Sequence, residues 1–140
     1  MKHNNGVVVV GSLHYDIVLN ASHQPKKGET IIGKNWYPKF GGKGGNQAIA
    51  ASSFGVPTKI ISAVGKDSFG KYILDKITSS EVNTEYIQII DKEKTGISVA
   101  ISDSDGEYGA VVISEANLKI NSNVLNVPLV WQNSKILMIQ

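Results

Sequence analysis

Four short apolar runs along the chain predict the strands of a parallel sheet. They cover residues 7–10, 59–64, 86–90 and 135–139. The first two are apolar at nearly every position, which is typical of strands buried on both faces under helices. The first run should therefore lie in the centre of the sheet.

Two helices fit between these runs. Residues 46–54 are rich in alanine and are followed by Gly55, a common helix terminator. Apolar residues at helical spacing follow Asp67 or Ser68, either of which can cap a second helix. Residues 121–125 predict a further helical turn or two. Strands and helices thus alternate as in an α/β fold with right-handed crossovers.

Two pairs of β-rich segments predict a small antiparallel structure attached to this sheet. The first pair is residues 17–19 and 30–32, separated by a turn segment with proline and glycine. The second pair is residues 97–101 and 109–113, and Asp105-Gly106 between them is a good hairpin signal. The expected architecture is a partial parallel sheet flanked by helices, with an antiparallel β lid.

The composition is that of one soluble globular domain. The 140 residues are 41% hydrophobic and 19% charged, enough for a sizeable core. The formal net charge is only +2 and the lysines are scattered, which argues against nucleic acid as a partner. The apolar run near the N-terminus is too short for a signal peptide or a membrane span. We expect a cytoplasmic protein without membrane contact.

Residue types that bind metals are few. Cysteine is absent, so a thiol nucleophile or a zinc cluster of cysteines is excluded. The three histidines, His3, His14 and His23, do not have metal-ligand spacing. We therefore expect no metal site.

The most distinctive segment is residues 40–47, where four glycines surround Lys43 just before a predicted helix. The backbone can approach a ligand closely there, and a helix N-terminus offers free N–H donors. No serine or threonine follows Lys43, so this is not a Walker A loop, and Gln47 stands where a dinucleotide fingerprint has its last glycine. Two plainer interpretations stay open: a flexible loop without a ligand, and a solvated Lys43 side chain.

Two further polar residues could bind hydroxyl groups. Asp16 follows the first strand by a few residues and should lie near the carboxyl edge of the sheet, where α/β folds bind ligands. It could equally be a turn residue that accepts bonds from nearby backbone N–H groups. The Asn46 amide could bind a sugar hydroxyl or simply the adjacent helical turn.

Five blocks of the sequence resemble the ribokinase-like, or PfkB, family of carbohydrate kinases in order and spacing. They are Gly11-Ser12-Leu13-His14-Tyr15-Asp16, Pro25 with Gly28-Glu29-Thr30, Gly41-Gly42-Lys43-Gly44-Gly45-Asn46-Gln47-Ala48, Ala63-Val64-Gly65-Lys66-Asp67-Ser68-Phe69-Gly70, and Thr95-Gly96. The glycine-rich block is similar to the first signature of the family. Together the blocks extend across nearly the whole chain.

The resemblance implies a sugar site, a lid and a reaction. The substrate-binding residues would be His14, Asp16, Gly42, Lys43, Gly44, Gly45 and Asn46. Lid strands would lie at about 13–40 and 96–114, cover the sugar, and could pair with a second copy in a homodimer. The intact family protein would use ATP and magnesium to phosphorylate a pentose or related sugar.

Three departures from the family pattern affect the expected substrate and activity. His14 stands where ribokinases commonly have asparagine, and Tyr15 beside it leaves a nucleoside or a hexose open. Glu115-Ala116-Asn117 replaces a Gly-Ala-Asn segment. The catalytic aspartate and the ATP-binding loops of the family have no counterpart in residues 1–140. We therefore expect no catalytic residue, and no kinase activity, in this chain alone.

Two other functions stay open. A non-catalytic sugar or nucleoside binding module would keep the cleft and the lid, but it should carry polar residues along residues 135–139, where the sequence is Lys-Ile-Leu-Met-Ile. A non-functional remnant would associate with other chains through exposed strands.

Overall fold

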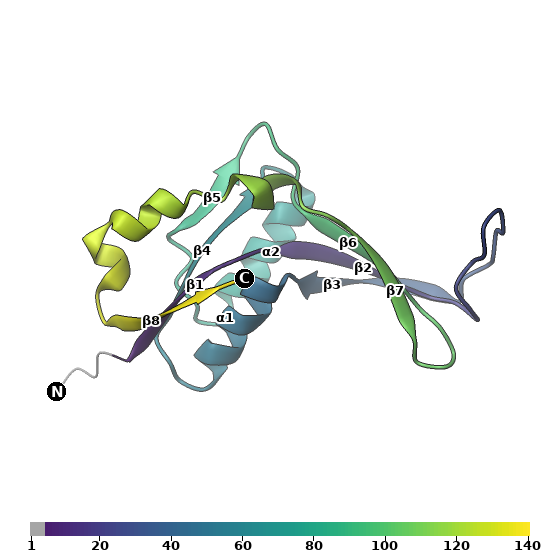
Figure 1. Cartoon of the computed structure of the whole chain (residues 1–140), viewed down its shortest axis with the longest axis horizontal. Coiled ribbons are helices and arrows are strands. Elements are labelled where there is room, and N and C mark those ends of the chain that lie inside the picture. The colour runs from purple at the N-terminus through teal and green to yellow at the C-terminus, as the bar shows by residue number, and fades with distance from the viewer. Residues whose placement is uncertain (1–4) are drawn as a thin grey trace.

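A computed structural model describes residues 5–140 and shows two sheets that meet at an angle (Figure 1). The main sheet has the strand order β5-β4-β1-β8. Its strands are β1 (Gly6–Val10), β4 (Thr58–Gly65), β5 (Ile87–Ile90) and β8 (Ser134–Ile139). All pairings in this sheet are parallel, and β1 lies between β4 and β8. The α/β fold and the central position of the first strand are confirmed.

Helices cover one face of the main sheet and short 3-10 turns cover the other (Figure 1). Val9 and Ile60 are fully buried against α1 (Lys43–Ser53) and α2 (Ser68–Thr78). On the opposite face, Val8, Ile61 and Val130 form a second cluster. The 3-10 helices on that side are η1 (Glu115–Lys119), η2 (Ser122–Asn126) and η3 (Pro128–Trp131). Continuous apolar strands are therefore explained by burial on both faces.

The second sheet, called the lid sheet below, has the order β3-β2-β6-β7. Its strands are β2 (His14–Asn20), β3 (Asn35–Gly41), β6 (Ile97–Ser102) and β7 (Tyr108–Ile113). The pairs β2–β3 and β6–β7 are antiparallel, as predicted, but the central pair β2–β6 is parallel. The lid sheet is therefore mixed: two hairpins joined side by side.

Three element boundaries differ from the sequence-based expectation. Residues 30–32 form no strand, and the partner of β2 begins at Asn35 instead. The first helix begins at Lys43 rather than at residue 46, so Gly44 and Gly45 belong to its first turn. The helical turn expected at 121–125 is the 3-10 helix η2.

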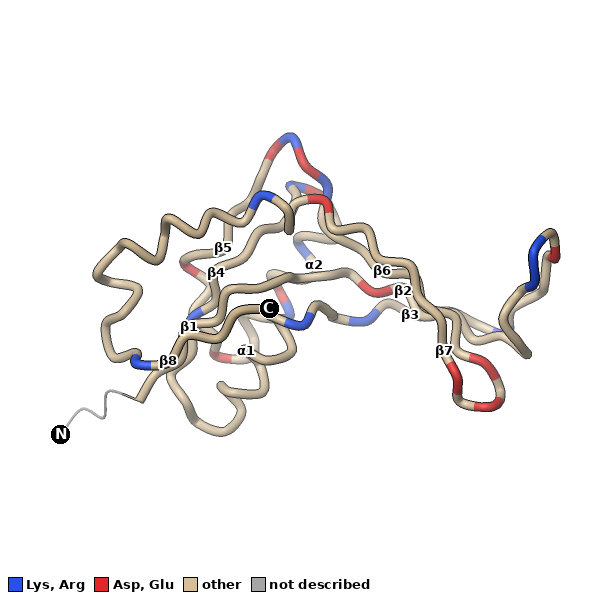
Figure 2. The backbone as a smooth tube through the Cα atoms, in the orientation of Figure 1, with Lys and Arg blue, Asp and Glu red and all other residues tan. Residues whose placement is uncertain are grey.

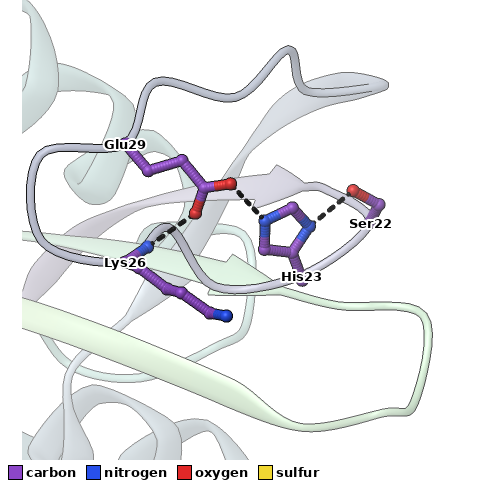
Figure 3. A network of polar contacts seen from close by, with 4 residues as sticks. All are labelled: Ser22, His23, Lys26 and Glu29. Atoms are coloured by element: carbon purple, nitrogen blue, oxygen red, sulfur yellow. Dashed lines mark hydrogen bonds and ion pairs between the residues drawn. The ribbon is translucent and has the colours of Figure 1, made fainter.

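Polar contacts of Glu29 hold the loop between β2 and β3 (Figure 3). Its carboxylate accepts a hydrogen bond from the Lys26 N–H at 2.8 Å and lies 3.0 Å from Nε2 of His23. These bonds, first that from Lys26, lower the pKa of Glu29. In the same loop, Ile31 is half-buried beside Leu19 and Ile101 of the lid sheet, whereas Ile32 is 95% exposed.

Asp67 joins the start of α2 to the start of the lid strand β6. It caps the helix by accepting from the Gly70 N–H at 2.7 Å, as the sequence predicted. The same carboxylate accepts from the Thr95 N–H at 2.8 Å and the Thr95 hydroxyl at 2.6 Å. Burial opposes these bonds, but their sum lowers the pKa of Asp67.

Candidate functional site

A cleft of about 750 Å³ lies where the lid sheet meets the start of α1. Its polar lining comes from Ser12 and the first residues of β2, from β3, from the first turn of α1 and from β6. The residues concerned are Ser12, His14, Asp16, Tyr37, Lys39, Gly42, Lys43, Asn46, Ser98 and Ser102, and Tyr108 of β7 adds a further hydroxyl group. Apolar and small residues of β6 and β7 complete the wall, including Ala100, Ala110 and Val112.

Asp16 stands in the middle of the cleft face of the lid sheet. The strand register places it between Lys39 on β3 and Ser98 on β6. Its Oδ1 accepts a hydrogen bond from the Ser98 hydroxyl at 2.7 Å. Gly41 leaves room for this carboxylate, since a Cβ there would overlap it. Asp16 is thus a strand residue rather than a turn residue, and it lines the cleft.

The glycine segment forms the first turn of α1 and the wall opposite the lid. Gly42 has φ 94°, a left-handed conformation that favours glycine, and a Cβ there would overlap Ser12. No side chain of the described residues caps this helix end. Lys43 and Asn46 are exposed and line the cleft. The N-terminus of α1 therefore offers a partly positive surface to hydroxyl or anionic oxygens.

Gly44 and Gly45 occupy a different position from the other predicted site residues. Both are buried and neither lines the cleft. A Cβ on Gly44 would stand 2.6 Å from the Gly11 backbone, and one on Gly45 would stand 2.7 Å from Leu13. They let α1 approach β1 and the start of β2. Of the seven predicted residues, the structure thus brings five together in the cleft: His14, Asp16, Gly42, Lys43 and Asn46.

His14 is half-buried beside Asp16. Its Nε2 atom is buried and has no hydrogen-bond partner. Burial lowers the pKa of the imidazole, and the neighbouring Asp16 carboxylate partly opposes this shift. The ring is therefore neutral at pH 7, and it supplies the cleft with a polar but uncharged wall.

Two residues differ from the sequence-based expectation, because Ser98 lines the cleft and Tyr15 does not. Ser98, Ala100 and Ser102 alternate along β6 toward the cleft, a period-2 pattern that can be recognised once Asp16 is paired with Ser98. Tyr15 points to the opposite face of β2, where it stacks on Phe69 with ring centroids 4.2 Å apart. It therefore does not contact the cleft.

Residues 5–140 contain neither a cluster of metal-binding side chains nor a helix that could span a membrane. There, no group of three or more His, Asp or Glu side chains gathers into a metal-binding cluster. His23 bonds Glu29 in the loop between β2 and β3, called the distal loop below, and His3 lies outside the described residues. Neither α1 nor α2, the α-helices of this range, is long and apolar enough to cross a membrane.

The family model described as pfkB family carbohydrate kinase matches residues 4–139. Ribokinase of Mus musculus is 38% identical over 119 residues, which cover 85% of this chain and 37% of the mouse protein. The chain thus spans less than half the length of this relative.

Solved structures give the same picture. Ribokinase of Arabidopsis thaliana complexed with ribose and ATP is 30% identical with a TM-score of 0.81, and the match covers 97% of this chain and 45% of that one. Ribokinase of Giardia lamblia is 29% identical with a TM-score of 0.86, over 98% of this chain and 42% of that one. Both sheets and the cleft between them therefore lie within the matched region.

Proposed function

The chain belongs to the pfkB family of carbohydrate kinases, and we propose that it forms the sugar-binding part of a kinase that phosphorylates a pentose or a related sugar. One observation carries the proposal: the Asp16 carboxylate and the first turn of α1 line the same cleft. A carboxylate accepts hydrogen bonds from sugar hydroxyls, while amide and N–H donors bind their oxygens.

The residues of the cleft would orient the sugar rather than react with it. Asp16, held by Ser98, would accept from two adjacent hydroxyls, and Asn46 and the N–H groups of α1 would bind a third. The lid sheet would exclude water, which otherwise competes with the sugar hydroxyl as the phosphoryl acceptor. A cleft of about 750 Å³ is large enough to hold a ribose-sized ligand.

ATP and magnesium enter the proposal only as ligands of the whole protein. ATP would supply the phosphoryl group, and we place its binding, that of magnesium and the catalytic base in the part of a ribokinase-length protein that this chain does not span. The exposed apolar residues of β8, such as Ile136 and Ile139, support this, because another layer of the whole protein would cover them. A stand-alone binding module should have polar residues there. We further place the protein in the cytoplasm.

The outer face of the lid sheet supports a homodimer. Ile17, Val99 and Val111 form one apolar row across that face, opposite the cleft. A second cavity of about 600 Å³, between Leu19, Trp36 and Ile101, continues it toward the distal loop. A second copy of the lid sheet would bury this surface. Sedimentation at increasing protein concentration measures whether the chain dimerises.

Calorimetric titration of D-ribose into the purified chain tests the sugar site. We expect binding by the chain itself, and at least a tenfold loss of affinity for Asp16→Asn, because an amide replaces one acceptor oxygen by a donor. Asp91→Asn is the matched control, since Asp91 pairs with Lys66 on the surface away from the cleft. Equal affinity of Asp16→Asn and the parent chain contradicts the proposal, as does no binding of ribose or related pentoses at millimolar concentration.

The same preparation tests whether the catalytic and ATP-binding residues lie outside this chain. Incubation of the chain with D-ribose, ATP and magnesium should yield no sugar phosphate. Turnover by the chain alone would show that it contains the catalytic and ATP-binding residues that we assign elsewhere.

A further inference from the structure

Asn117 bonds a backbone segment 104 residues away in sequence, directly beside the cleft. Its Nδ2 donates to the Leu13 carbonyl at 2.8 Å, and its Oδ1 accepts from the Leu13 N–H at 2.9 Å. A third bond runs from Nδ2 to the Ser114 carbonyl at 3.0 Å. The side-chain amide therefore pairs with Leu13 as a neighbouring strand would.

Leu13 lies between two residues that line the cleft. Its side chain is fully buried in the main core, while Ser12 and His14 on either side reach the cleft. Strand pairing of β2 begins only at His14, opposite Gly41. The N–H and carbonyl of Leu13 thus depend on Asn117, because both sheets leave them without a backbone partner.

The surroundings of Asn117 leave its amide little freedom to move. A Cβ on Gly96 would overlap its Nδ2 and would stand 2.9 Å from Cδ2 of His14. Gly96 also accepts from the Tyr15 N–H at 2.9 Å. Asn117, Gly96 and His14 therefore pack as one unit at the base of the lid sheet.

The backbone before Asn117 is strained in a way that fits this role. Glu115 has φ 45°, a left-handed conformation that a residue with a side chain adopts at a cost of about 1 kcal/mol or more. The turn leads from the end of β7 into η1 and brings Asn117 back toward Leu13. Strain of this kind persists where the surrounding contacts require it.

We propose that Asn117 is a positioning residue of the sugar site, which acts through Leu13 on His14 and Asp16 without lining the cleft itself. The proposal rests on the proposed function for the identity of the ligand as a sugar. The positioning does not depend on that ligand. If the amide is removed, two buried polar groups of Leu13 lose their partners, and the segment from Ser12 to Asp16 must shift or admit water.

The test compares two Asn117 variants with two controls. Asn117→Ala removes all three bonds, while Asn117→Asp keeps an acceptor for the Leu13 N–H and loses the donor. Asn121→Ala is the first control, because the Asn121 side chain accepts one local hydrogen bond, from the Asn123 N–H, and the backbone bond from Asn121 to Gln88 is kept in the variant. Val130→Ala is the second, because it destabilises the core on the far face of the main sheet without contact to the cleft.

The first readout is NMR without ligand. We expect exchange of the Leu13 amide proton to accelerate at least tenfold in Asn117→Ala, with moved resonances of the His14 ring and the Asp16 amide. Asn117→Asp should show moved resonances with slower exchange than Asn117→Ala. Unchanged His14 and Asp16 resonances in a folded Asn117 variant overturn the proposal, as does the same pattern in Val130→Ala.

The second readout is D-ribose affinity. We expect a loss of about tenfold in Asn117→Ala, a smaller loss in Asn117→Asp, and parent affinity in both controls at a temperature where all are folded. If the parent chain binds no ribose, the proposed function fails while the NMR readout still decides the role of Asn117. If Asn117→Ala does not fold, the resonances of Asn117→Asp decide it.

Discussion

The two sheets of this protein are stabilised by different interactions. In the main sheet, β1 and β4 are buried almost throughout, and Ile60 is fully buried between strands and helices. In the lid sheet no residue of β2 or β6 is fully buried, and every residue of β7 is exposed. Side-chain packing stabilises the main sheet, whereas the lid sheet is stabilised mainly by the backbone hydrogen bonds between its strands and by contacts at its base. The cleft lies where these two regions meet.

This difference assigns different tasks to the two regions. A packed sheet fixes the first turn of α1, and hence Lys43 and Asn46, in one place. A thin sheet carries Asp16 and Ser98 and can move as a unit about its base, because little apolar surface holds it elsewhere. Such a pairing of a packed wall and a thin wall is consistent with the sugar site that we propose, which would have to admit a ligand and then exclude water.

The largest expected effect separates the two sheets by stability. Ile60→Ala in the main sheet should lower the free energy of unfolding by about 3 kcal/mol, because it leaves a cavity in a closed core. In the monomer, at protein concentrations below those at which the proposed dimer forms, Val111→Ala in β7 should lower it by at most about 0.5 kcal/mol, since Val111 is 69% exposed in the single chain. Urea denaturation measures both values. Equal losses would show that the outer face of the lid sheet is packed, for example in a dimer.

Two tryptophans allow each region to be followed in that experiment. Trp36 lies on β3 of the lid sheet, and Trp131 lies in η3 beside the main sheet. Trp131→Phe leaves emission from the lid sheet, and Trp36→Phe leaves emission from the main sheet. A lower urea midpoint for the Trp36 signal would confirm that the lid sheet is the weaker unit, and coincident midpoints would contradict it.

A smaller contrast comes from two aspartates that each accept several hydrogen bonds. Asp67 joins α2 to Thr95 at the base of the lid sheet, and Asp67→Ala should cost about 2 kcal/mol. Asp103 accepts from two N–H groups of the exposed β6–β7 turn, where acidic residues gather (Figure 2), and Asp103→Ala should cost about 0.5 kcal/mol. Thermal denaturation of both variants checks this order. A larger loss for Asp103→Ala would mean that the hairpin tip contributes more than the base.

The sequence could predict the elements whose pattern is local. Continuous apolar runs indicated all four main-sheet strands, and the Asp67 cap was visible as a residue type before a helical pattern. The β3 strand could not be found this way, because Pro38 and Lys39 interrupt its apolar pattern. Proline is tolerated there because β3 is an edge strand. The β-prone residues at 30–32 predict a strand by their types, but they lie in the loop between β2 and β3.

The site could be predicted only where the chain brings its residues together locally. The glycine segment and Asp16 stand out by their types and by the family resemblance. Ser98 is 82 residues from Asp16, and Asn117 is 104 residues from Leu13, so only the register of β2 on β6 and the turn after β7 reveal them. Local sequence patterns do not show which residues pair with partners far away in the sequence.

The smallest expected effect is a pH dependence that arises at the junction of the two regions. Burial lowers the pKa of His14, so between that pKa and the ordinary value of 6.5 the unfolded chain binds a proton that the folded chain does not. Stability is then fully present above pH 6.5 and declines as the pH falls through this window. The parent chain should therefore lose more of its free energy of unfolding than His14→Asn between pH 7.5 and pH 5.5. Urea denaturation at the two pH values measures the difference, and an equal loss in both proteins would show that His14 is hydrated in the open cleft.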